Sequence, residues 1–245
     1  MSAKQPHIGI ITQARMTSTR LPGKIFKEIN HKKLLQYHID RLQQTGFDIA
    51  IATTINATDD CVYEFAEKQN IKVHRGSENN VLSRFHETAT KFKFDIIVRV
   101  TSDCPLIDGD LIHSNIEKYL QFNNPNLYMS NGVDRTYARG FDMEIFGFQL
   151  LNEAFQKATD EKDLEHVTPY IWKNRSGKVE FYSIKQVVNN SRFRITVDTV
   201  EDFELIKVLI EDYHADRLPY NEIEKILNQH PELVAMNAHI EQKKV

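Results

Sequence analysis

The sequence has little cysteine and no long hydrophobic run. Its only cysteines are Cys61 and Cys104, and their wide spacing fits neither a zinc motif nor a disulfide framework. The apolar run at residues 8–11 is far too short for a signal peptide or a membrane span. From these absences we expect a cytoplasmic protein, in a reducing compartment and without a membrane partner.

Net charge is also small. The formal net charge is -3 at pH 7, so bulk charge does not predict nucleic-acid binding, and any anion site must be local. Hydrophobic residues make up 41% and charged residues 27%, the usual mix of a globular protein. Because no linker-like or low-complexity tract interrupts the 245 residues, we expect a single domain over residues 1–245.

Apolar, β-rich runs alternate with helical periodicity along most of the chain. The pattern predicts strands at residues 8–12, 48–53, 71–74, 95–100, 127–130, 142–147, 178–185 and 193–198. It predicts helices at residues 34–42, 58–68, 81–92, 109–120, 149–158, 163–173, 201–213 and 220–229, with Thr58 and Asp108 as N-caps of two of them. This alternation predicts an α/β fold with a mostly parallel, mixed sheet and helices on both faces. The less regular segment 125–147 is the best candidate for a protruding arm or lid.

A basic loop follows the first predicted strand. The stretch "QARMTSTRLPGK", residues 13–24, contains Arg15, Arg20 and Lys24. In open α/β sheets, ligands bind at the carboxyl ends of strands, and clustered cations there suit phosphate groups. Gly23 permits close backbone approach. Charge alone fits a solvated loop equally well, but the strand-end position favours a phosphate ligand.

This loop has too little glycine for two familiar phosphate-binding motifs. A P-loop needs Ser or Thr after Gly-Lys, whereas Ile25 follows Gly23-Lys24, and Ser18 stands at the position of the first glycine. The dinucleotide fingerprint needs three glycines, and the loop has one. The sequence therefore predicts neither a Walker ATPase nor an NAD enzyme of the usual kind.

Two aspartates follow predicted strands. Asp103 comes after the strand at 95–100, and Asp198 ends the strand at 193–198. Taken singly, Asp103 fits a turn before a proline and Asp198 fits a helix N-cap. At one edge of a sheet, however, the two carboxylates could share a magnesium ion, which binds proteins through one or two carboxylates plus substrate phosphates. Together with the basic loop, they favour a Mg²⁺ site.

Four further residues are weaker candidates. Arg84, in "VLSRFHETA", is expected to reach a nucleotide from its helix. Arg139 and Asp142 lie in the irregular region, where an acceptor substrate could be held. His166, in "LEHVTPYIW", fits a packing residue on a helix as well as an acceptor-binding one.

Six stretches resemble a known family in order and spacing. They are "IITQARMTSTRLPGKIF", "VLSRFHETA", "VRVTSDCPLID", "RGFDMEIF", "EHVTPYIW" and "RITVDTVEDFELI". They are similar to the sugar cytidylyltransferases, which include the CMP-KDO and CMP-sialic acid synthetases, and most similar to the branch of the spore coat polysaccharide biosynthesis protein SpsF. The resemblance covers residues from about 7 to 215.

The resemblance implies a Rossmann-like, GT-A-type nucleotidyltransferase fold, often dimeric, so a homodimer is a candidate assembly. It implies Mg²⁺-dependent transfer of a cytidylyl group from CTP to a small sugar acid, giving a CMP-sugar and pyrophosphate for surface polysaccharide or glycan biosynthesis. The metal ligands would be Asp103 and Asp198. Independently of the resemblance, Arg139, Asp142 and His166 are the candidates for binding the acceptor. The catalytic residues would be Arg15, Lys24 and Asp103. The nucleotide-binding residues would be Gln13, Ala14, Arg15, Ser18, Arg20, Gly23, Lys24 and Arg84.

Two alternatives stay open at this point. One is a glycosyltransferase on the same fold that uses a finished nucleotide-sugar. Such enzymes usually carry Asp-x-Asp after a central strand, where this chain has Asp103-Cys104-Pro105. The later Asp108-Gly109-Asp110 is interpreted as a helix start, like Asp59-Asp60. The other alternative is a catalytically silent nucleotide-binding protein.

Overall fold

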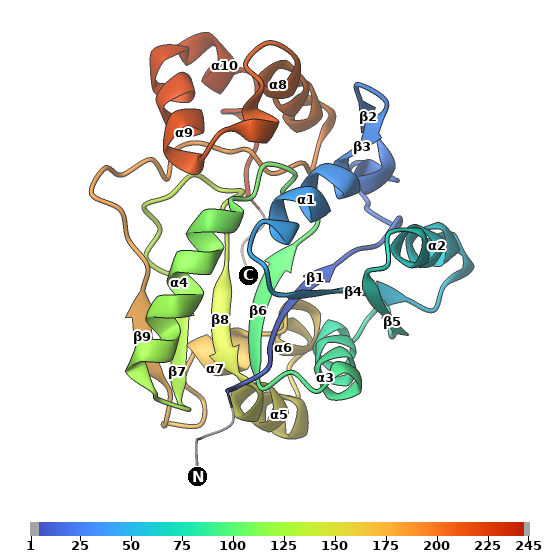
Figure 1. The fold of residues 1–245 in the computed structure, drawn as a ribbon, viewed down its shortest axis with the longest axis vertical. Helices are drawn as coiled ribbons and strands as arrows, with labels where there is room; N and C mark the ends of the chain where they lie inside the picture. Colours follow the sequence, from blue (N-terminus) through green and yellow to red (C-terminus); the bar gives the residue numbers. More distant parts are fainter. Residues whose placement is uncertain (1–4, 243–245) are drawn as a thin grey trace.

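The computed structural model describes residues 5–242, and a seven-stranded sheet forms its centre (Figure 1). The strand order is β5-β4-β1-β6-β8-β7-β9. Strand β8 runs antiparallel to β6 and β7, whereas the other neighbouring strands are parallel. The predicted mostly parallel, mixed sheet is therefore confirmed. The strands are β1 (Ile8–Gln13), β4 (Asp48–Thr54), β5 (Lys72–Gly76), β6 (Ile96–Thr101), β7 (Leu127–Ser130), β8 (Glu144–Gly147) and β9 (Glu180–Ser183).

Helices cover both faces of this sheet, as predicted. Successive side chains of a strand point to opposite faces, so Ile10 belongs to one hydrophobic core and Ile11 to the other. The first core includes side chains of α1 (Leu34–Gln43), α2 (Asp60–Lys68), α4 (Gly109–Phe122), α8 (Val200–Glu211), α9 (Tyr220–Gln229) and α10 (Pro231–Ala235). The second includes side chains of α3 (Val81–Phe92), α5 (Phe148–Lys157) and α7 (Pro169–Trp172). A small hairpin of β2 (Glu28–Ile29) and β3 (Lys32–Lys33) follows the basic loop.

Two helix predictions are corrected, one by a break inside the helix and the other at its N-terminal end. The single helix predicted at 163–173 is two helices, α6 (Glu161–His166) and α7, because Val167 has a positive φ of 72° and Pro169 starts the second one. Thr58 is not an N-cap, because a 3₁₀ turn at Ala57–Asp59 precedes α2. Asp108, in contrast, caps α4 as predicted, since its side chain accepts a hydrogen bond from the Leu111 N–H.

The strand predicted at 193–198 is wrong. The backbone of this segment bonds to two irregular stretches, at Arg139 and at Asp103, and not to a strand of the sheet. Within the segment only Arg194 forms a β-bridge, and its partner is Arg139. Gly140, beside that bridge, has a φ of 119°, and a Cβ there would lie 2.9 Å from backbone atoms of Ile195. Both the positive φ and the close approach of the Ile195 backbone therefore require a glycine at this position.

The segment 125–147, the predicted arm or lid, contains β7 and β8 of the sheet. Between them, the buried Asn131 donates to the Phe141 carbonyl oxygen at 2.6 Å and accepts from the Met143 N–H at 2.9 Å. These hydrogen bonds join the beginning of the loop between β7 and β8 to its end. The single domain and a lid movement of this segment stay predictions.

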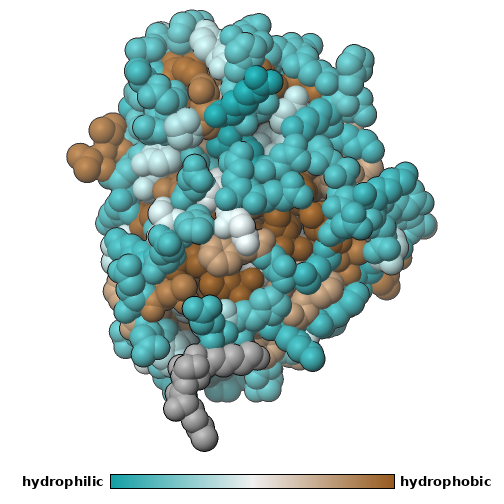
Figure 2. Space-filling view, in the orientation of Figure 1, coloured by the Kyte–Doolittle hydropathy of each residue, from teal (hydrophilic) through white to brown (hydrophobic). Residues whose placement is uncertain are grey.

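The loop after β9 projects from the molecule. Figure 2 shows a hydrophobic projection at the left edge, where Figure 1 draws this loop. Val187 is fully exposed in the loop and Val188 is 61% exposed. The buried Glu224 of α9 fixes the loop by accepting hydrogen bonds from Gln186 and Asn190. Within residues 5–242, no helix has the length and hydrophobicity that a membrane span needs.

Candidate active site

A cleft of about 710 Å³ opens at the carboxyl ends of β1 and β6. Gln13 and Thr101, the last residues of these strands, contribute to its lining. The basic loop forms one side, and residues 77–81, before and at the start of α3, form another. Helix α6 adds Glu161, Glu165 and His166. The strand-end position is the one at which α/β sheets bind ligands.

Ten of the predicted site residues line this cleft together. They are Gln13, Ala14, Arg15, Ser18, Arg20, Lys24, Arg84, Asp103, His166 and Asp198. Gly23, Arg139 and Asp142 are not among its lining residues. Gly23 shapes the basic loop instead, with φ of 67° and its N–H bonded to the Met16 carbonyl oxygen at 2.9 Å. The carboxylate of Asp142 pairs with Arg135, and the acceptor-binding role of Arg139 and Asp142 stays a prediction.

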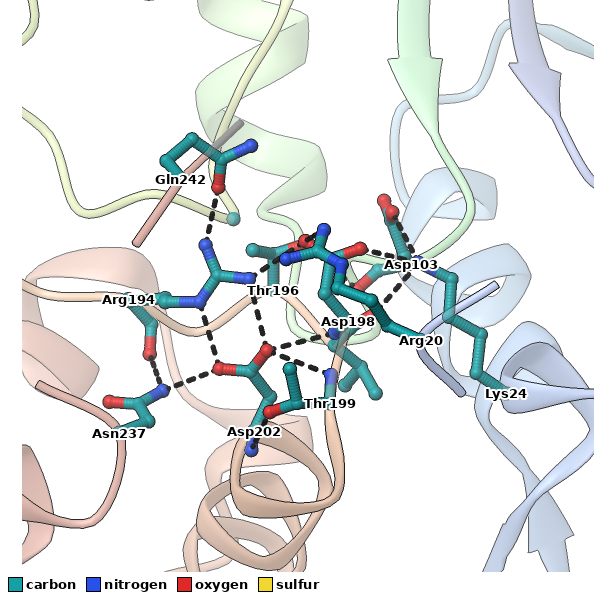
Figure 3. A network of polar contacts seen from close by, with 12 residues as sticks. Arg20, Lys24, Asp103, Arg194, Thr196, Asp198, Thr199, Asp202, Asn237 and Gln242 are labelled. Carbon is teal, nitrogen blue, oxygen red and sulfur yellow. Dashed lines mark hydrogen bonds and ion pairs between the residues drawn. The ribbon is translucent and has the colours of Figure 1, made fainter. Parts of the chain in front are cut away.

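Lys24 lies between the two predicted metal ligands (Figure 3). Its Nζ is 2.8 Å from Oδ2 of Asp103 and 2.8 Å from Oδ1 of Asp198. The same ammonium donates to the carbonyl oxygen of Val197 at 2.8 Å. Burial alone would lower the pKa of Lys24, but the two carboxylates outweigh it and raise that pKa. The ammonium is therefore a firmly charged partner of both aspartates.

Asp103 keeps its negative charge for the same reason. Burial would raise the pKa of this carboxyl, but Lys24, together with hydrogen bonds from Thr101 and the backbone, outweighs burial and lowers the pKa of Asp103 to about 2. The side chain is 24% exposed, so it remains accessible from the cleft. The loop that carries it is held by the buried His38, which bridges Thr12 of β1 and the carbonyl oxygen of Cys104 at 2.9 Å each.

Asp198 is held by a second set of charges. Its Oδ2 lies 2.8 Å from Arg20 and 2.7 Å from Arg194. Arg194 in turn forms a two-point ion pair with the fully buried Asp202, at 2.8 and 3.0 Å. Asp202 also accepts the N–H of Asp198 at 2.9 Å and completes a capping box with Thr199 at the start of α8. Asp198 is therefore fixed in place, although no regular strand carries it.

The basic loop is anchored at its other end by two acidic residues. Glu78 accepts hydrogen bonds from Thr17 and Asn56 at 2.6 Å each and lies 3.3 Å from Arg15. The buried Asp59 accepts the Met16 N–H at 2.6 Å. The loop therefore has a defined shape.

Arg84 is one of the residues that line the cleft and is only 2% exposed. Its Nη1 donates to the Ser77 carbonyl oxygen at 2.5 Å, and its Nε is buried without a hydrogen-bond partner among residues 5–242. Burial, and then the neighbouring Arg15, lower the pKa of Arg84 to about 10, so it stays cationic at neutral pH. Burial also lowers the pKa of His166, which favours the neutral imidazole.

Three oxygens around Lys24 suit a hard cation. They belong to Asp103, Asp198 and the Val197 carbonyl, and all three reach one point, the Nζ of Lys24, at 2.8 Å. Among residues 5–242, no group of three or more His, Cys, Asp and Glu side chains could hold a metal. Two carboxylates that are completed by substrate phosphates are nevertheless the usual protein share of a Mg²⁺ site. The donor set therefore fits magnesium.

The literal Asp-x-Asp sequence at 108–110 has a structural role. Asp108 is buried, and its two oxygens accept the N–H groups of Leu111, at 2.8 Å, and of Tyr220, at 2.6 Å. Asp110 is exposed in the first turn of α4. Neither residue lines the cleft. The interpretation as a helix start is confirmed, and the motif gives no support to a glycosyltransferase.

Sequence reasoning missed several residues of this site. The pair Thr199-x-x-Asp202 carried a readable signal, because it has the spacing of a capping box. Asp59 was interpreted only as a helix start, and Glu78 stands in a turn without any motif. The ion pair of Arg194 with Asp202 joins residues that no periodicity connects.

Comparisons with known proteins identify the family of this chain. The sequence model of a family described as "Cytidylyltransferase" matches residues 9–245. The spore coat polysaccharide biosynthesis protein SpsF of Bacillus subtilis is 32% identical over 232 residues, which cover 91% of this chain and 94% of that protein. A cytidylyltransferase structure from Leptospira borgpetersenii is similar with a TM-score of 0.89 at 31% identity, over 98% of this chain and 100% of that one.

A more distant structure shares the fold. CMP:2-keto-3-deoxy-manno-octonic acid synthetase, solved in complex with CTP, has a TM-score of 0.61 at 16% identity, over 84% of this chain and 99% of that one. The α/β nucleotidyltransferase fold implied by the sequence is thereby confirmed. A family match from residue 9 to residue 245, together with identities of 31% and 32% along nearly the full length of two relatives, makes this chain a member of the cytidylyltransferase family of nucleotidyltransferase enzymes.

Proposed function

We propose that this protein transfers a cytidylyl group from CTP to a hydroxyl of a small sugar acid and releases pyrophosphate. The observation that carries this proposal is the convergence of Arg15, Arg20 and Lys24 with Asp103 and Asp198 in one cleft. Cations there suit a triphosphate, and the two carboxylates suit Mg²⁺. The CTP bound to the distant CMP-sugar synthetase and the family membership support the choice of nucleotide.

In this proposal, the basic loop binds and orients the triphosphate. Arg15 and Arg20 each present a forked guanidinium, and Lys24 presents a point charge. The acceptor hydroxyl oxygen then attacks the α-phosphorus, the hydroxyl proton passes to solvent, and the bond from this phosphorus to the bridging oxygen of the pyrophosphate breaks. Catalysis of such a transfer is mainly positioning and charge neutralisation, and the loop cations neutralise the leaving group. Asp103 and Asp198 would hold Mg²⁺, which supplies further charge neutralisation at the phosphates when it is bound.

A pyrophosphate-release assay tests the reaction. The protein is incubated with Mg²⁺, with each of CTP, UTP, GTP and ATP in turn, and with a panel of 3-deoxy-octulosonic and nonulosonic acids. We expect release with CTP and at least one sugar acid, and loss of that release with EDTA. Transfer from a finished nucleotide-sugar, with no pyrophosphate from any pair, would replace this proposal by the glycosyltransferase alternative.

Arg15→Met tests the phosphate role of the loop. We expect the affinity for CTP to fall about 10-fold to 100-fold, because a hydrogen bond to a charged group is lost. The free energy of unfolding should change by less than about 0.5 kcal/mol, since the Arg15 side chain is 43% exposed and its ion pair with Glu78 is 3.3 Å long. Calorimetric titration with CTP and urea denaturation measure the two quantities.

Arg217→Met is the matched control for this substitution. Its side chain is 82% exposed, and it does not line the cleft. We expect it to bind CTP as the wild type does. Equal CTP affinity in both variants would remove Arg15 from the phosphate site.

A further inference from the structure

The basic loop is electrically balanced by carboxylates of its own protein. Arg15 pairs with Glu78, Arg20 with Asp198, and Lys24 with both Asp103 and Asp198. These are the cations that the proposed function assigns to the triphosphate. Each of them would therefore have competing anionic partners, one or two carboxylates of the protein and the triphosphate of the substrate.

For Lys24, this competition extends to the metal. The oxygens that surround its Nζ at 2.8 Å are the ones that suit Mg²⁺. An ammonium and a magnesium ion cannot occupy one position, and they would repel each other strongly at short distance. Whenever Asp103 and Asp198 bind a divalent cation together, the ammonium of Lys24 has to lie elsewhere.

The ammonium of Lys24 can reach a second position, within the cleft. Its side chain is 11% exposed and lines the same cleft as Arg15 and Arg20. A lysine has a flexible four-carbon stem, so its charged end can move by several ångströms while its backbone stays in place. A triphosphate in the cleft would provide a new anionic partner for it.

We propose that Lys24 is an internal cation that holds the place of the metal. In this proposal, which rests on the proposed function, the ammonium neutralises Asp103 and Asp198 until metal and nucleotide arrive together. Asp103 and Asp198 would then hold the metal, and the ammonium of Lys24 would pair with the triphosphate. Metal alone would leave the displaced ammonium without an anion. Nucleotide alone would draw the ammonium away from both aspartates, so that Asp103 would lose its ion pair with Lys24 and Asp198 would keep only its arginine partners. Lys24 thereby makes the binding of each ligand depend on the other.

Removal of the ammonium provides the test, because it should open the carboxylates to metal in the absence of nucleotide. We expect Lys24→Met to bind Mn²⁺ at least about 10-fold more tightly than the wild type, with free Mn²⁺ counted by electron paramagnetic resonance. Mn²⁺ alone should also raise the melting temperature of the variant and leave that of the wild type nearly unchanged. Lys24→Gln is the second variant, for use if Lys24→Met does not fold.

Lys27→Met is the matched control. It removes the same charge three positions along the chain, where Lys27 lies over the ring of Phe203 at 5.0 Å. We expect this variant to bind Mn²⁺ as weakly as the wild type. An equal gain in the Lys24 and Lys27 variants would indicate general electrostatics and overturn the proposal. Unchanged Mn²⁺ affinity in the Lys24 variants would overturn it as well.

The experiment contains neither nucleotide nor acceptor, so its outcome is independent of the proposed reaction. If the pyrophosphate assay fails but Mn²⁺ binding increases as expected, the assignment of CTP or of the sugar acid as substrate is rejected. The role of Lys24 as a cation in the place of the metal is then retained. Pyrophosphate release with a negative Mn²⁺ result would keep the reaction and remove the exchange.

Discussion

Asp103→Asn is expected to slow pyrophosphate release about 1000-fold, because the proposed function assigns this carboxylate to Mg²⁺, and loss of a metal ligand removes several kcal/mol of transition-state stabilisation. The variant should remain folded. Lys24 keeps the carboxylate of Asp198 and the carbonyl of Val197 as partners, and an asparagine oxygen at position 103 can still accept a hydrogen bond from its ammonium. The measurement is the turnover rate at saturating CTP and Mg²⁺, with circular dichroism to follow the fold.

Asp110→Asn is the control for Asp103→Asn, since it makes the same chemical change at an exposed residue outside the cleft. We expect a wild-type rate from this variant. A rate within twofold of wild type in the Asp103 variant would show that this carboxylate does not take part in the reaction. Asp198→Asn should also lose turnover, but it disturbs Arg20 and Arg194 as well and is therefore the less selective test.

Asp202→Asn is expected to have the largest effect on stability, a loss of about 3–5 kcal/mol in the free energy of unfolding. Asp202 is fully buried and accepts hydrogen bonds from Arg194, from Asn237 and from two backbone N–H groups. The substitution leaves the guanidinium of Arg194 with a weaker partner and turns an amide N–H toward other donors. Urea denaturation followed by circular dichroism measures the loss.

Glu201→Gln is the control for Asp202→Asn, because Glu201 is exposed in the same turn of α8. We expect it to change stability by less than about 0.5 kcal/mol. A loss below about 1 kcal/mol in the Asp202 variant would contradict the assigned role of this ion pair.

The pH dependence gives a second measure of the same contact. Burial would raise the pKa of Asp202, but Arg194 and the N–H donors outweigh it and lower that pKa. The stabilising contribution of Asp202 is therefore fully present above the unfolded-state pKa of about 3.9 and is lost as the pH falls through the lower folded-state pKa. In the Asp202→Asn variant, this acid-dependent loss should be smaller than in the wild type.

Local patterns in the sequence predicted the sheet and most helices well. The buried strands β1, β4 and β6 and the cap Asp108 depend on residues that are close in sequence, so periodicity and capping rules suffice to find them. The break between α6 and α7 was missed, because the helical pattern continues through Val167, whose backbone is turned by its tertiary surroundings.

Most of the site residues predicted from the sequence line the cleft, but the sequence did not predict which of them form ion pairs and hydrogen bonds with one another. Strand-end placement brought Asp103 and Asp198 correctly to the basic loop, even though the segment before Asp198 is not a strand. The position of Lys24 between them depends on a contact over 174 residues, which no local rule reports. Glu78 was missed for a similar reason, since its partner Thr17 is 61 residues away.

The distance along the chain between Lys24 and Asp198 has a consequence for folding. All seven strands of the sheet precede Asp198 in the sequence, so a growing chain can assemble them before that aspartate exists. Contacts between residues so far apart form late, because a large loop must close first. During synthesis, Asp198 is therefore the last carboxylate to join the basic loop, and a chain that stops before Asp198 has the loop cations but lacks half of the candidate metal site. We expect nucleotidyl transfer to appear only when the chain is nearly complete, whereas the sheet can form earlier.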